Sequence, residues 1–473
     1  MQYEVIIGLE VHAQLLTKSK IFCSCSTKFG AGPNTQTCPV CLGMPGSLPV
    51  LNRSAVEYAI MMAVAINCSI APASRFARKN YFYPDLPKGY QISQYEMPLA
   101  ENGWIEINVS GQFKRVGVRR IHLEEDAGKS LHEKGRTLID FNRCGIPLIE
   151  IVSEPDIRST REAVSYLKKL RTILRYLGIC DGNMEQGSLR CDANLSLRPK
   201  GTDALGTRAE VKNMNSFKGV QRALDYEIQR QRAVLDSGGQ VAQETRLWDE
   251  AEGKTYTMRG KEESSDYRYF PEPDLLPVVT GPDWIGKISQ FLPELPDNKK
   301  GRFVREYGLS GDEADILTSD RYLADYFESC QNEAQEPKIV ANWIINELRR
   351  ELKTDEREIR ECPLTPGNLA SLIQLIKAGT ISGRMAKEVF EEMYRTGVDA
   401  EEIVKAKGTQ ITDDEEIGKS VQAVLEENPD QVARYRAGKE MLFDFFVGQV
   451  MKKTKGKANP QLVNKILEKE LSG

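Results

Sequence analysis

Alternating apolar and polar residues predict β-strands in the first part of the chain, up to about residue 290. The segment YEVIIGLEVHAQL puts apolar side chains on one face and polar side chains on the other, the polar ones being Glu10, His12 and Gln14. The segment SLRCDANLSLR alternates most regularly, and Asp192 and Asn194 share its polar face. Neighbouring strands of this kind, joined by polar turns, predict an antiparallel or mixed sheet.

Two amphipathic helices interrupt these strands, one after Ser159 and one after Ser216, both typical N-cap residues. From about residue 293 to the end, helical periodicity replaces the strand pattern, with Gly and Pro between the helices. The last three predicted helices lie at 413–429, 434–453 and 459–471. The pattern therefore predicts an α+β protein with a mainly β domain, an all-α helical domain and an all-α tail domain, at 1–292, 293–408 and 409–473.

Composition places the chain among ordinary globular proteins. It has 473 residues, of which 40% are hydrophobic and 28% charged, and its formal net charge is −4. This charge argues against binding nucleic acid by overall charge alone, although it leaves room for a local basic surface. No apolar run reaches the eighteen or so residues of a membrane span, and the first residues lack the pattern of a signal peptide. We therefore expect a cytoplasmic protein.

Four of the ten cysteines cluster in one loop, FCSCSTKFGAGPNTQTCPVCLG. Two close pairs on a flexible loop, Cys23 with Cys25 and Cys38 with Cys41, can meet at tetrahedral geometry around Zn²⁺. The other interpretations are free thiols or a redox pair. A redox pair is typical of a CxxC that opens a helix after a strand, and this loop has no such setting. Four thiolates leave no open coordination position, so the predicted zinc is structural.

Four polar clusters lie on or next to predicted strands whose other face is apolar. They are Glu10 with His12; Glu124, Glu125 and Asp126; Asp192 with Asn194; and Glu210 with Lys212. If the strands are neighbours, their carboxylates converge on one sheet face and could hold Mg²⁺, which prefers oxygen ligands and often accompanies nucleotide phosphates. The alternative is a solvated face with ordinary ion pairs. The phosphate-loop motif GxxxxGK[ST] and the nucleophile motif GxSxG are both absent from the sequence.

Two basic segments are candidates for nucleotide or RNA binding. RKNYFYPDLPKGYQISQYE interleaves aromatic residues with Lys79 and Lys88, an arrangement that can stack and neutralise a nucleotide, although Tyr and Phe are more often buried in the core. MKKTKGK places four lysines between two predicted helices, where they either face phosphates or form a solvated turn. These are Lys452, Lys453, Lys455 and Lys457.

Several long segments resemble one known family. They include YEVIIGLEVHAQL, RKNYFYPDLPKGYQISQYE, HLEEDAGKS, MEQGSLRCDANLSLR, EVKNMNSF and GQVMKKTKGKANPQLVNKIL. The chain resembles the B-subunit family of the aspartyl/glutamyl-tRNA(Asn/Gln) amidotransferases, from its first strand to its last helix. The resemblance implies a β-rich cradle domain, a helical domain and a tail of about three helices like a stand-alone YqeY protein.

The resemblance also implies the function. In this family the A subunit releases ammonia from glutamine, and a small C subunit ties A and B together. The B subunit uses ATP and Mg²⁺ to phosphorylate the side-chain carboxylate of Glu-tRNA(Gln) or Asp-tRNA(Asn), and ammonia then displaces phosphate. The expected activity is thus that of a carbon–nitrogen ligase that works as an A–B–C complex. Some family members carry CxC…CxxC with zinc and others lack the cysteines, which implies a structural role for this metal.

The site residues implied by the resemblance fall into four groups. The catalytic and Mg²⁺-binding residues are Glu10, His12 and Glu125, with Asp192 as a further ligand. The nucleotide- or substrate-binding candidates are Lys79, Tyr81, Lys88, Glu124, Arg190, Asn194, Glu210 and Lys212. Zinc is assigned to the four clustered cysteines, and tRNA to the four lysines of MKKTKGK. Strict alternation groups Glu124 with His122, opposite Glu125, so a bulge or the strand end has to intervene if Glu125 is the ligand.

Two rival functions remain. A non-catalytic tRNA-binding scaffold within the same complex would favour basic and aromatic residues on the sheet face, whereas this face is acidic. A zinc-dependent thiol oxidoreductase lacks the helix that such a CxxC motif requires. ATP consumption that depends on Glu10 and Glu125 separates the enzyme from the scaffold.

Overall fold

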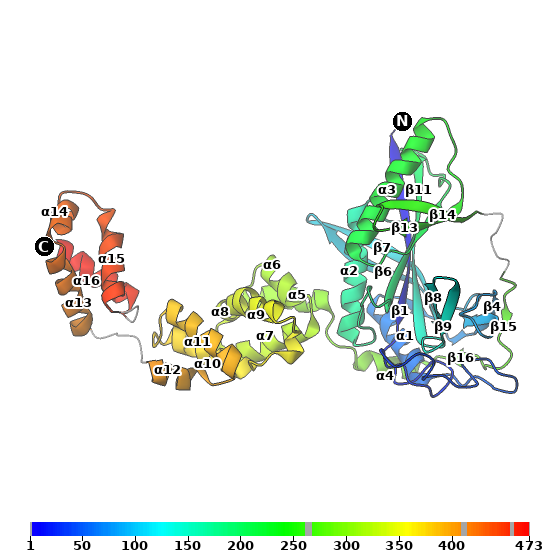
Figure 1. Ribbon diagram of the computed structural model, residues 1–473, viewed down its shortest axis with the longest axis horizontal. Coiled ribbons are helices and arrows are strands. Elements are labelled where there is room, and N and C mark those ends of the chain that lie inside the picture. The colour runs from blue at the N-terminus through cyan, green and yellow to red at the C-terminus, as the bar shows by residue number, and fades with distance from the viewer. Residues whose placement is uncertain (1, 261–266, 408–413, 455–457, 473) are drawn as a thin grey trace. The chain divides into compact units, whose positions relative to one another are not determined.

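The computed structural model describes residues 2–260, 267–407, 414–454 and 458–472 (Figure 1). The fold class is α+β, with a large mixed sheet and many helices, as predicted. The chain divides into two compact units, Met1–Pro296 and Asp297–Gly473. In the described ranges, no helix is both long and apolar enough to cross a lipid bilayer.

A nine-stranded sheet forms the centre of the first unit, in the order β14-β13-β12-β11-β1-β10-β7-β6-β2. Its strands are β1 Tyr3–Gln14, β2 Ser69–Ile70, β6 Ala100–Val109, β7 Gln112–Glu125, β10 Pro147–Ser153, β11 Leu189–Pro199, β12 Ala209–Lys212, β13 Glu244–Asp249 and β14 Lys254–Gly260. The pair β12–β13 is parallel, and the other paired neighbours in this sheet are antiparallel. The sequence-predicted strands at the N-terminus and at 188–198 are therefore confirmed as β1 and β11.

Three helices cover the apolar face of this sheet, namely α1 Arg53–Ala65, α2 Thr160–Leu177 and α3 Phe217–Asp236. Ser159 and Ser216 cap α2 and α3 as predicted, each side-chain oxygen accepting a hydrogen bond from the third helical residue. Ile7, Leu9 and Val11 of β1 are fully buried against these helices. Because the apolar face is used in the core, the polar face of the same strands is left for other contacts.

Smaller elements extend the first unit. They are the sheet β15-β4-β5, the pair β16-β3, the hairpin β8-β9 and the helix α4. Their bounds are β3 Ala73–Ser74, β4 Ala77–Asn80, β5 Tyr90–Ser93, β8 Lys129–Glu133, β9 Arg136–Asp140, β15 Phe270–Pro271, β16 Val278–Val279 and α4 Pro282–Gln290. Polar contacts join this region to the central sheet, as where β5 lies beside β7 and Ile92 N donates to Glu125.

The second unit is helical, as predicted. Its elements up to residue 407 are α5 Pro296–Tyr307, α6 Gly311–Leu317, α7 Arg321–Ala334, α8 Pro337–Asn342, α9 Arg349–Thr354, α10 Pro366–Lys377, α11 Gly383–Thr396 and α12 Ala400–Lys407. A π-helical segment, Trp343–Leu348, joins α8 to α9. One hydrophobic cluster spans 303–404 and another 417–471. These clusters fall on either side of the predicted boundary near 408, and the division into three domains stays a prediction.

The last part of the chain contains four described helices where the sequence analysis expected three. They are α13 Asp414–Glu427, α14 Pro429–Arg436, α15 Leu442–Lys453 and α16 Pro460–Ser472. The single helix predicted at 434–453 is wrong, because the chain breaks between α14 and α15 at Gly438, whose φ is +98°. That backbone angle lies outside the helical region and is easily adopted only by glycine.

The central position of β1 generates a stability prediction. Replacing Leu9 by Ala should lower the free energy of unfolding of the first unit by about 3 kcal/mol, since the fully buried side chain leaves a cavity. Urea denaturation followed by hydrogen exchange of β1 peptides would measure this. Leu131→Ala, on the exposed hairpin, is the control and should change stability by less than about 0.5 kcal/mol. Equal effects of the two changes would contradict the prediction.

Candidate functional site

Three neighbouring strands place two histidines and a glutamate in one row on the polar sheet face. His12 of β1 pairs with Glu150 of β10, and Glu150 pairs with His122 of β7. Glu124 lies two residues beyond His122 and shares its face. Glu150 is not among the sequence-predicted site residues, and His122 was mentioned only because it shares a face with Glu124. The one available signal was that Glu150 is the only charged residue in the buried strand PLIEIVS.

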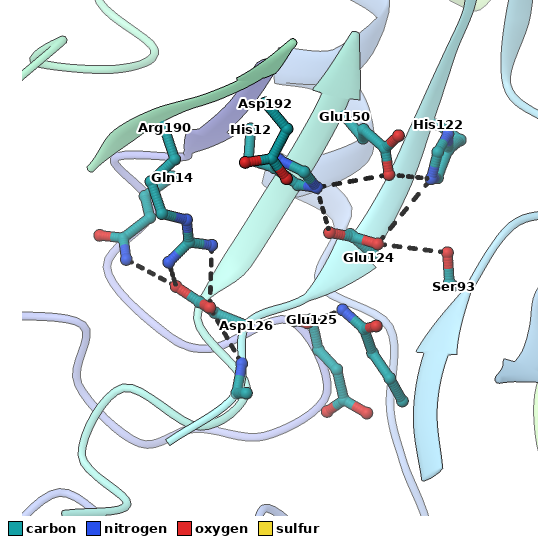
Figure 2. Close-up of polar contacts among 12 residues, drawn as sticks. His12, Gln14, Ser93, His122, Glu124, Glu125, Asp126, Glu150, Arg190 and Asp192 are labelled. Carbon is teal, nitrogen blue, oxygen red and sulfur yellow. Dashed lines mark hydrogen bonds and ion pairs between the residues drawn. The ribbon is translucent and has the colours of Figure 1, made fainter. Parts of the chain in front are cut away.

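The four side chains contact one another closely (Figure 2). The Nε2 atom of His12 lies 3.5 Å from a carboxylate oxygen of Glu124 and 3.4 Å from one of Glu150. The Nε2 atom of His122 lies 3.1 Å from Glu150 and 3.8 Å from Glu124. One ligand atom from each of His12, Glu124 and Glu150 can be chosen so that all three lie within 4.8 Å of one another. A nitrogen and two carboxylates at this spacing suit a divalent cation.

Electrostatics within this acid–histidine cluster follow from burial and from charge. Burial alone would lower the pKa of both histidines, but the carboxylates of Glu150 and Glu124 outweigh it and raise both, that of His122 to about 9. Burial would likewise raise the pKa of Glu124 and Glu150, and the histidines instead lower both. The carboxylates therefore stay ionised at neutral pH, as metal ligands must be.

Glu10 belongs to an adjoining polar network. Its carboxylate accepts a hydrogen bond of 2.9 Å from Asn194, and its cross-strand partner is Asp192. Lys212 donates to Asp192 at 2.5 Å and lies 3.0 Å from Glu210. Burial, followed by the charges of Glu150 and Glu210, raises the pKa of Glu10. The register thus brings the predicted clusters of β1, β11 and β12 onto one face.

Asp126 organises the end of this face next to β7. Its carboxylate accepts two hydrogen bonds from Arg190, at 3.0 and 3.1 Å, and one of 2.7 Å from Gln14 (Figure 2). Burial opposes ionisation of Asp126, but Arg190 and Arg143 lower its pKa. Arg190, a predicted phosphate- or carboxylate-binding residue, is therefore already held by a carboxylate.

Glu125 is not part of the acid–histidine cluster. The β7–β10 register runs without a shift from His122 to Glu125, so Glu124 and not Glu125 shares the face of His122. Figure 2 shows the Glu125 carboxylate pointing away from the cluster. It accepts hydrogen bonds from Lys88 and from the backbone N–H of Ile92. The structure therefore gathers His12 with Glu124 and Glu150, and pairs Glu125 with Lys88.

An aromatic group stands beside the cluster. The Tyr81 and Tyr267 rings lie 6.0 Å apart, as do those of Tyr267 and Tyr269, and Tyr269 stacks on Tyr95 at 4.1 Å. Lys79 Nζ lies 4.7 Å from the Tyr267 ring centre. Burial and the charges of Glu124 and Glu150 raise the pKa of Tyr269, which places this ring next to the acids. Lys79 and Tyr81 thus lie in this aromatic group, and their role in nucleotide or substrate binding stays a prediction.

The four clustered cysteines converge. One sulfur atom from each of Cys23, Cys25, Cys38 and Cys41 lies within 4.8 Å of the others. The hydrogen bond from Cys23 and the nearby Lys20 ammonium lower the pKa of Cys41 to about 4, against the effect of burial. Thiolate is the metal-binding form. The cluster could therefore hold a metal ion such as zinc.

The cysteine loop packs against the Lys88 segment. Gly43, two residues after Cys41, lies so close to Lys88 that a Cβ atom at this position would clash with the lysine side chain. A pocket between the loop and the sheet is lined in part by Lys20, Cys41, Lys88 and Glu125. The loop thus forms one wall beside Glu125.

The predicted RNA-binding lysines are only partly described. Lys452 is exposed at the end of α15, and Lys453 forms an ion pair with Glu427 at 2.5 Å. Lys455 and Lys457 lie outside the described residues. Lys452 and Lys453 are thus both exposed in the last turn of α15.

Comparison with known proteins decides the family. A family model described as the GatB/GatE catalytic domain matches residues 5–286, more than half of the chain, and a second, described as a GatB domain, matches residues 325–471. The chain belongs to the GatB family. Relatives named as the B subunit of aspartyl/glutamyl-tRNA(Asn/Gln) amidotransferase align with it over the full length of both chains. Identity is 60% for Thermodesulfovibrio yellowstonii, 58% for Geotalea uraniireducens and 57% for Caldanaerobacter subterraneus.

The raised pKa of His122 generates a prediction for this GatB-family chain. Because the folded value of about 9 exceeds the ordinary 6.5, protonation of His122 stabilises the fold fully below pH 6.5, and this contribution is lost as pH rises through 9. In Glu150→Gln the pKa should fall toward or below 6.5, since burial then outweighs the remaining charge. NMR of ¹³C-labelled histidine in metal-free protein would measure it, because the sequence has only three histidines. Exposed His132 is the internal control. If the pKa of His122 is the same in Glu150→Gln as in the wild type, the assignment is contradicted.

Proposed function

We propose that this chain is the B subunit of a tRNA-dependent amidotransferase that works as a complex with an A subunit (the glutaminase) and a C subunit. It uses ATP to phosphorylate the side-chain carboxylate of Glu-tRNA(Gln), Asp-tRNA(Asn) or both. Ammonia from the A subunit then gives the amide. The observation that carries this proposal is the acid–histidine cluster of His12, His122, Glu124 and Glu150 on the polar sheet face of a GatB-family chain.

The chemistry explains why such a site suffices without a nucleophilic residue. A carboxylate resists attack because its charge repels nucleophiles and because oxide is a very poor leaving group. Phosphorylation removes that charge and supplies a good leaving group. Phosphoryl transfer requires positioning and charge neutralisation more than covalent help from the protein. A polar, partly buried sheet face with fixed charges meets this requirement.

His12, Glu124 and Glu150 are the residues that would hold Mg²⁺. Bound there, the ion would supply the positive charge that neutralises nucleotide phosphates. Because histidine is an unusual Mg²⁺ ligand, His12 acts either through a water molecule or by fixing the two carboxylates, which it contacts at 3.5 and 3.4 Å. Glu10 and Asp192, on the adjoining rung, remain candidates for outer contacts to the ion or its waters.

The neighbouring polar residues supply the rest of the site. Lys79 and Tyr81 border the cluster and are candidates to contact the nucleotide or the aminoacyl end. Asn194, Glu210 and Lys212 fix Glu10 and Asp192 through the hydrogen bonds described above. Lys88 and Glu125 form a buried ion pair next to the cysteine loop, where a change of partner could make Lys88 available to a substrate carboxylate.

Loss of one cluster carboxylate should abolish the phosphorylating activity. We expect Glu124→Gln, in the reconstituted A–B–C complex, to lower ADP and Gln-tRNA formation by at least about 100-fold, because an uncharged amide holds Mg²⁺ weakly. The assay supplies Glu-tRNA(Gln), ATP, Mg²⁺ and ammonium chloride, so that the glutaminase is bypassed. Glu133→Gln, on the exposed β8–β9 hairpin, is the matched control.

Two results would contradict the assignment. If Glu124→Gln forms ADP and Gln-tRNA at the wild-type rate, this cluster does not take part in the reaction. If Glu10→Ala and Glu150→Gln also keep the wild-type rate, a non-catalytic scaffold is favoured. Paramagnetic broadening provides a second readout that needs no activity. Mn²⁺ should broaden the resonances of His12 and His122 in the wild type but leave His132 sharp, and Glu124→Gln should weaken the effect.

The cysteine cluster supports a structural zinc site. Four convergent thiols complete a tetrahedral zinc shell by themselves, so no position remains for substrate. The loop lies beside Lys88 and Glu125, and zinc would therefore fix the wall of the site at this point. Its proposed role is to fold a flap near the acceptor end of the tRNA.

Removing one zinc ligand should release the metal. We expect the wild type to hold about one Zn²⁺ per chain, and Cys38→Ser to lose it and to exchange amide hydrogens faster across residues 22–43. Metal analysis and hydrogen exchange would measure the two effects. Cys362→Ser, at a half-buried cysteine of the helical unit, is the control. Unchanged zinc content in Cys38→Ser would show that the cluster is not the zinc site.

The tail is the proposed RNA-binding part. Lys452 and Lys453, with Lys455 and Lys457 from the same segment, are the candidates for contacting phosphates of the tRNA body. The ion pair of Lys453 with Glu427 is exposed, so it would cost little to exchange that carboxylate for a phosphate.

A further inference from the structure

Most cations near the acid–histidine cluster already have carboxylate partners. Lys212 is paired with Asp192 and Glu210, Arg190 is paired with Asp126 in a bidentate manner, and Lys88 is paired with Glu125. Each of these pairs satisfies the charge of the lysine or arginine inside the protein. A phosphate that enters the site therefore needs a different cation as its partner.

Arg120 meets this requirement. It lies on β7 two residues before His122, and its cross-strand partner Val152 is in turn the partner of Glu10. Arg120 is thus on the polar face, one rung from the cluster. Within the described part of the chain, no carboxylate lies within ion-pair distance of Arg120, and its buried Nε atom has no hydrogen-bond partner. A buried donor without a partner destabilises the fold unless a ligand satisfies it, so it points to a missing ligand.

The local backbone explains how Arg120 reaches this face. The β7–β10 register shifts between Val152 and Ser153, so that β7 has one extra residue at this point. The preceding residue, Arg119, is exposed and paired with Glu154 at 2.9 Å. The two consecutive arginines therefore differ: Arg119 is paired with a carboxylate at the surface, and Arg120 lies on the polar face without a carboxylate partner among the described residues. Bulges that re-aim a side chain are common next to active sites.

An aromatic pair supports Arg120 without using its donors. The Cζ atom of Arg120 lies 6.0 Å from the ring centre of Tyr95, and Tyr95 stacks on Tyr269 with the two planes 5° apart. A ring face attracts a guanidinium but accepts none of its N–H groups in the plane. The donors stay available for a planar or tetrahedral oxyanion. His122 adds a second buried nitrogen, Nδ1, that has no partner among the described residues.

We propose that Arg120 binds the γ-phosphoryl group of ATP during its transfer. This inference rests on the phosphorylating activity proposed above and adds a residue to it. In the step, a substrate carboxylate oxygen forms a bond to the γ-phosphorus while the bond from that phosphorus to the β,γ-bridging oxygen breaks, and ADP leaves with the electron pair. Arg120 donates N–H groups to the equatorial oxygens of the transferring group, where negative charge is spread.

Substitution of Arg120 tests the proposal in the reconstituted A–B–C complex with ammonium chloride as the nitrogen source. Arg120→Gln should lower kcat/KM for ATP by about 100-fold or more, with most of the loss in kcat, because the contact is strongest in the transition state. Arg120→Lys keeps the charge but not the planar fork, and should retain part of the activity. Added guanidinium should partly restore Arg120→Gln but not Arg120→Lys. Arg119→Gln is the matched control and should behave like the wild type.

The outcomes separate this proposal from the proposed function. If Glu124→Gln abolishes ADP formation while Arg120→Gln stays within about threefold of the wild type, the phosphorylating site stands and the role of Arg120 is wrong. If Arg120→Gln weakens binding of Glu-tRNA(Gln) and leaves KM and kcat for ATP unchanged, Arg120 contacts an RNA phosphate and the ATP assignment is overturned. If the wild type forms no ADP, the proposed function itself fails. We expect Arg120→Gln to bind tRNA with wild-type affinity, to lose ATP turnover, and to regain part of that turnover when guanidinium is added.

Discussion

The register of three antiparallel strands is the constraint on which the site depends. His12, Glu150 and His122 meet only because β1, β10 and β7 pair so that these residues lie opposite one another. A slip by one residue would turn each side chain to the other face and bury charge among the helices. The register is in turn fixed by the fully buried Ile7, Leu9 and Val11 on the reverse side of β1. Packing on one face therefore sets the chemistry on the other.

Charge on the polar face is distributed in pairs, and this pattern shows which groups hold the framework and which are left for ligands. Asp126 with Arg190 and Asp192 with Lys212 are satisfied within the protein, and they orient the strands' polar side chains. The acid–histidine cluster is different, because its two carboxylates share two histidines and keep unused oxygen lone pairs. Arg120 is the complementary case, a cation with unused donors. The face thus holds a fixed frame of ion pairs around the acid–histidine cluster and Arg120, which both keep hydrogen-bonding groups available for a ligand.

The sequence predicted the strands well where one face of each is apolar, as in β1 and β11, because period-two alternation follows directly from backbone geometry. It was less informative about the site. Glu150 was missed since a single acid in an apolar strand carries no pattern of its own, and only its cross-strand partners His12 and His122 give it a role. The role of Glu125 as a metal ligand stays a prediction: alternation assigns Glu124 to the face of His122, and the structure pairs Glu125 with Lys88. Alternation from His122 places Arg120 on the polar face, but only the structure shows that no carboxylate among the described residues pairs with it.

The central place of β1 in the sheet also has a consequence for how the chain is made. Its neighbours are β10, which begins at Pro147, and β11, which runs from Leu189 to Pro199, so both pairings join residues far apart in the sequence. Contacts of such long range form slowly. At roughly 5–20 residues per second, a ribosome completes the second neighbour about 10–40 s after the first strand. Both edges of β1 lack their native partners until β10 has been made, and one edge still lacks its partner until β11 has been made, so β1 is open to pairing with other chains over that time.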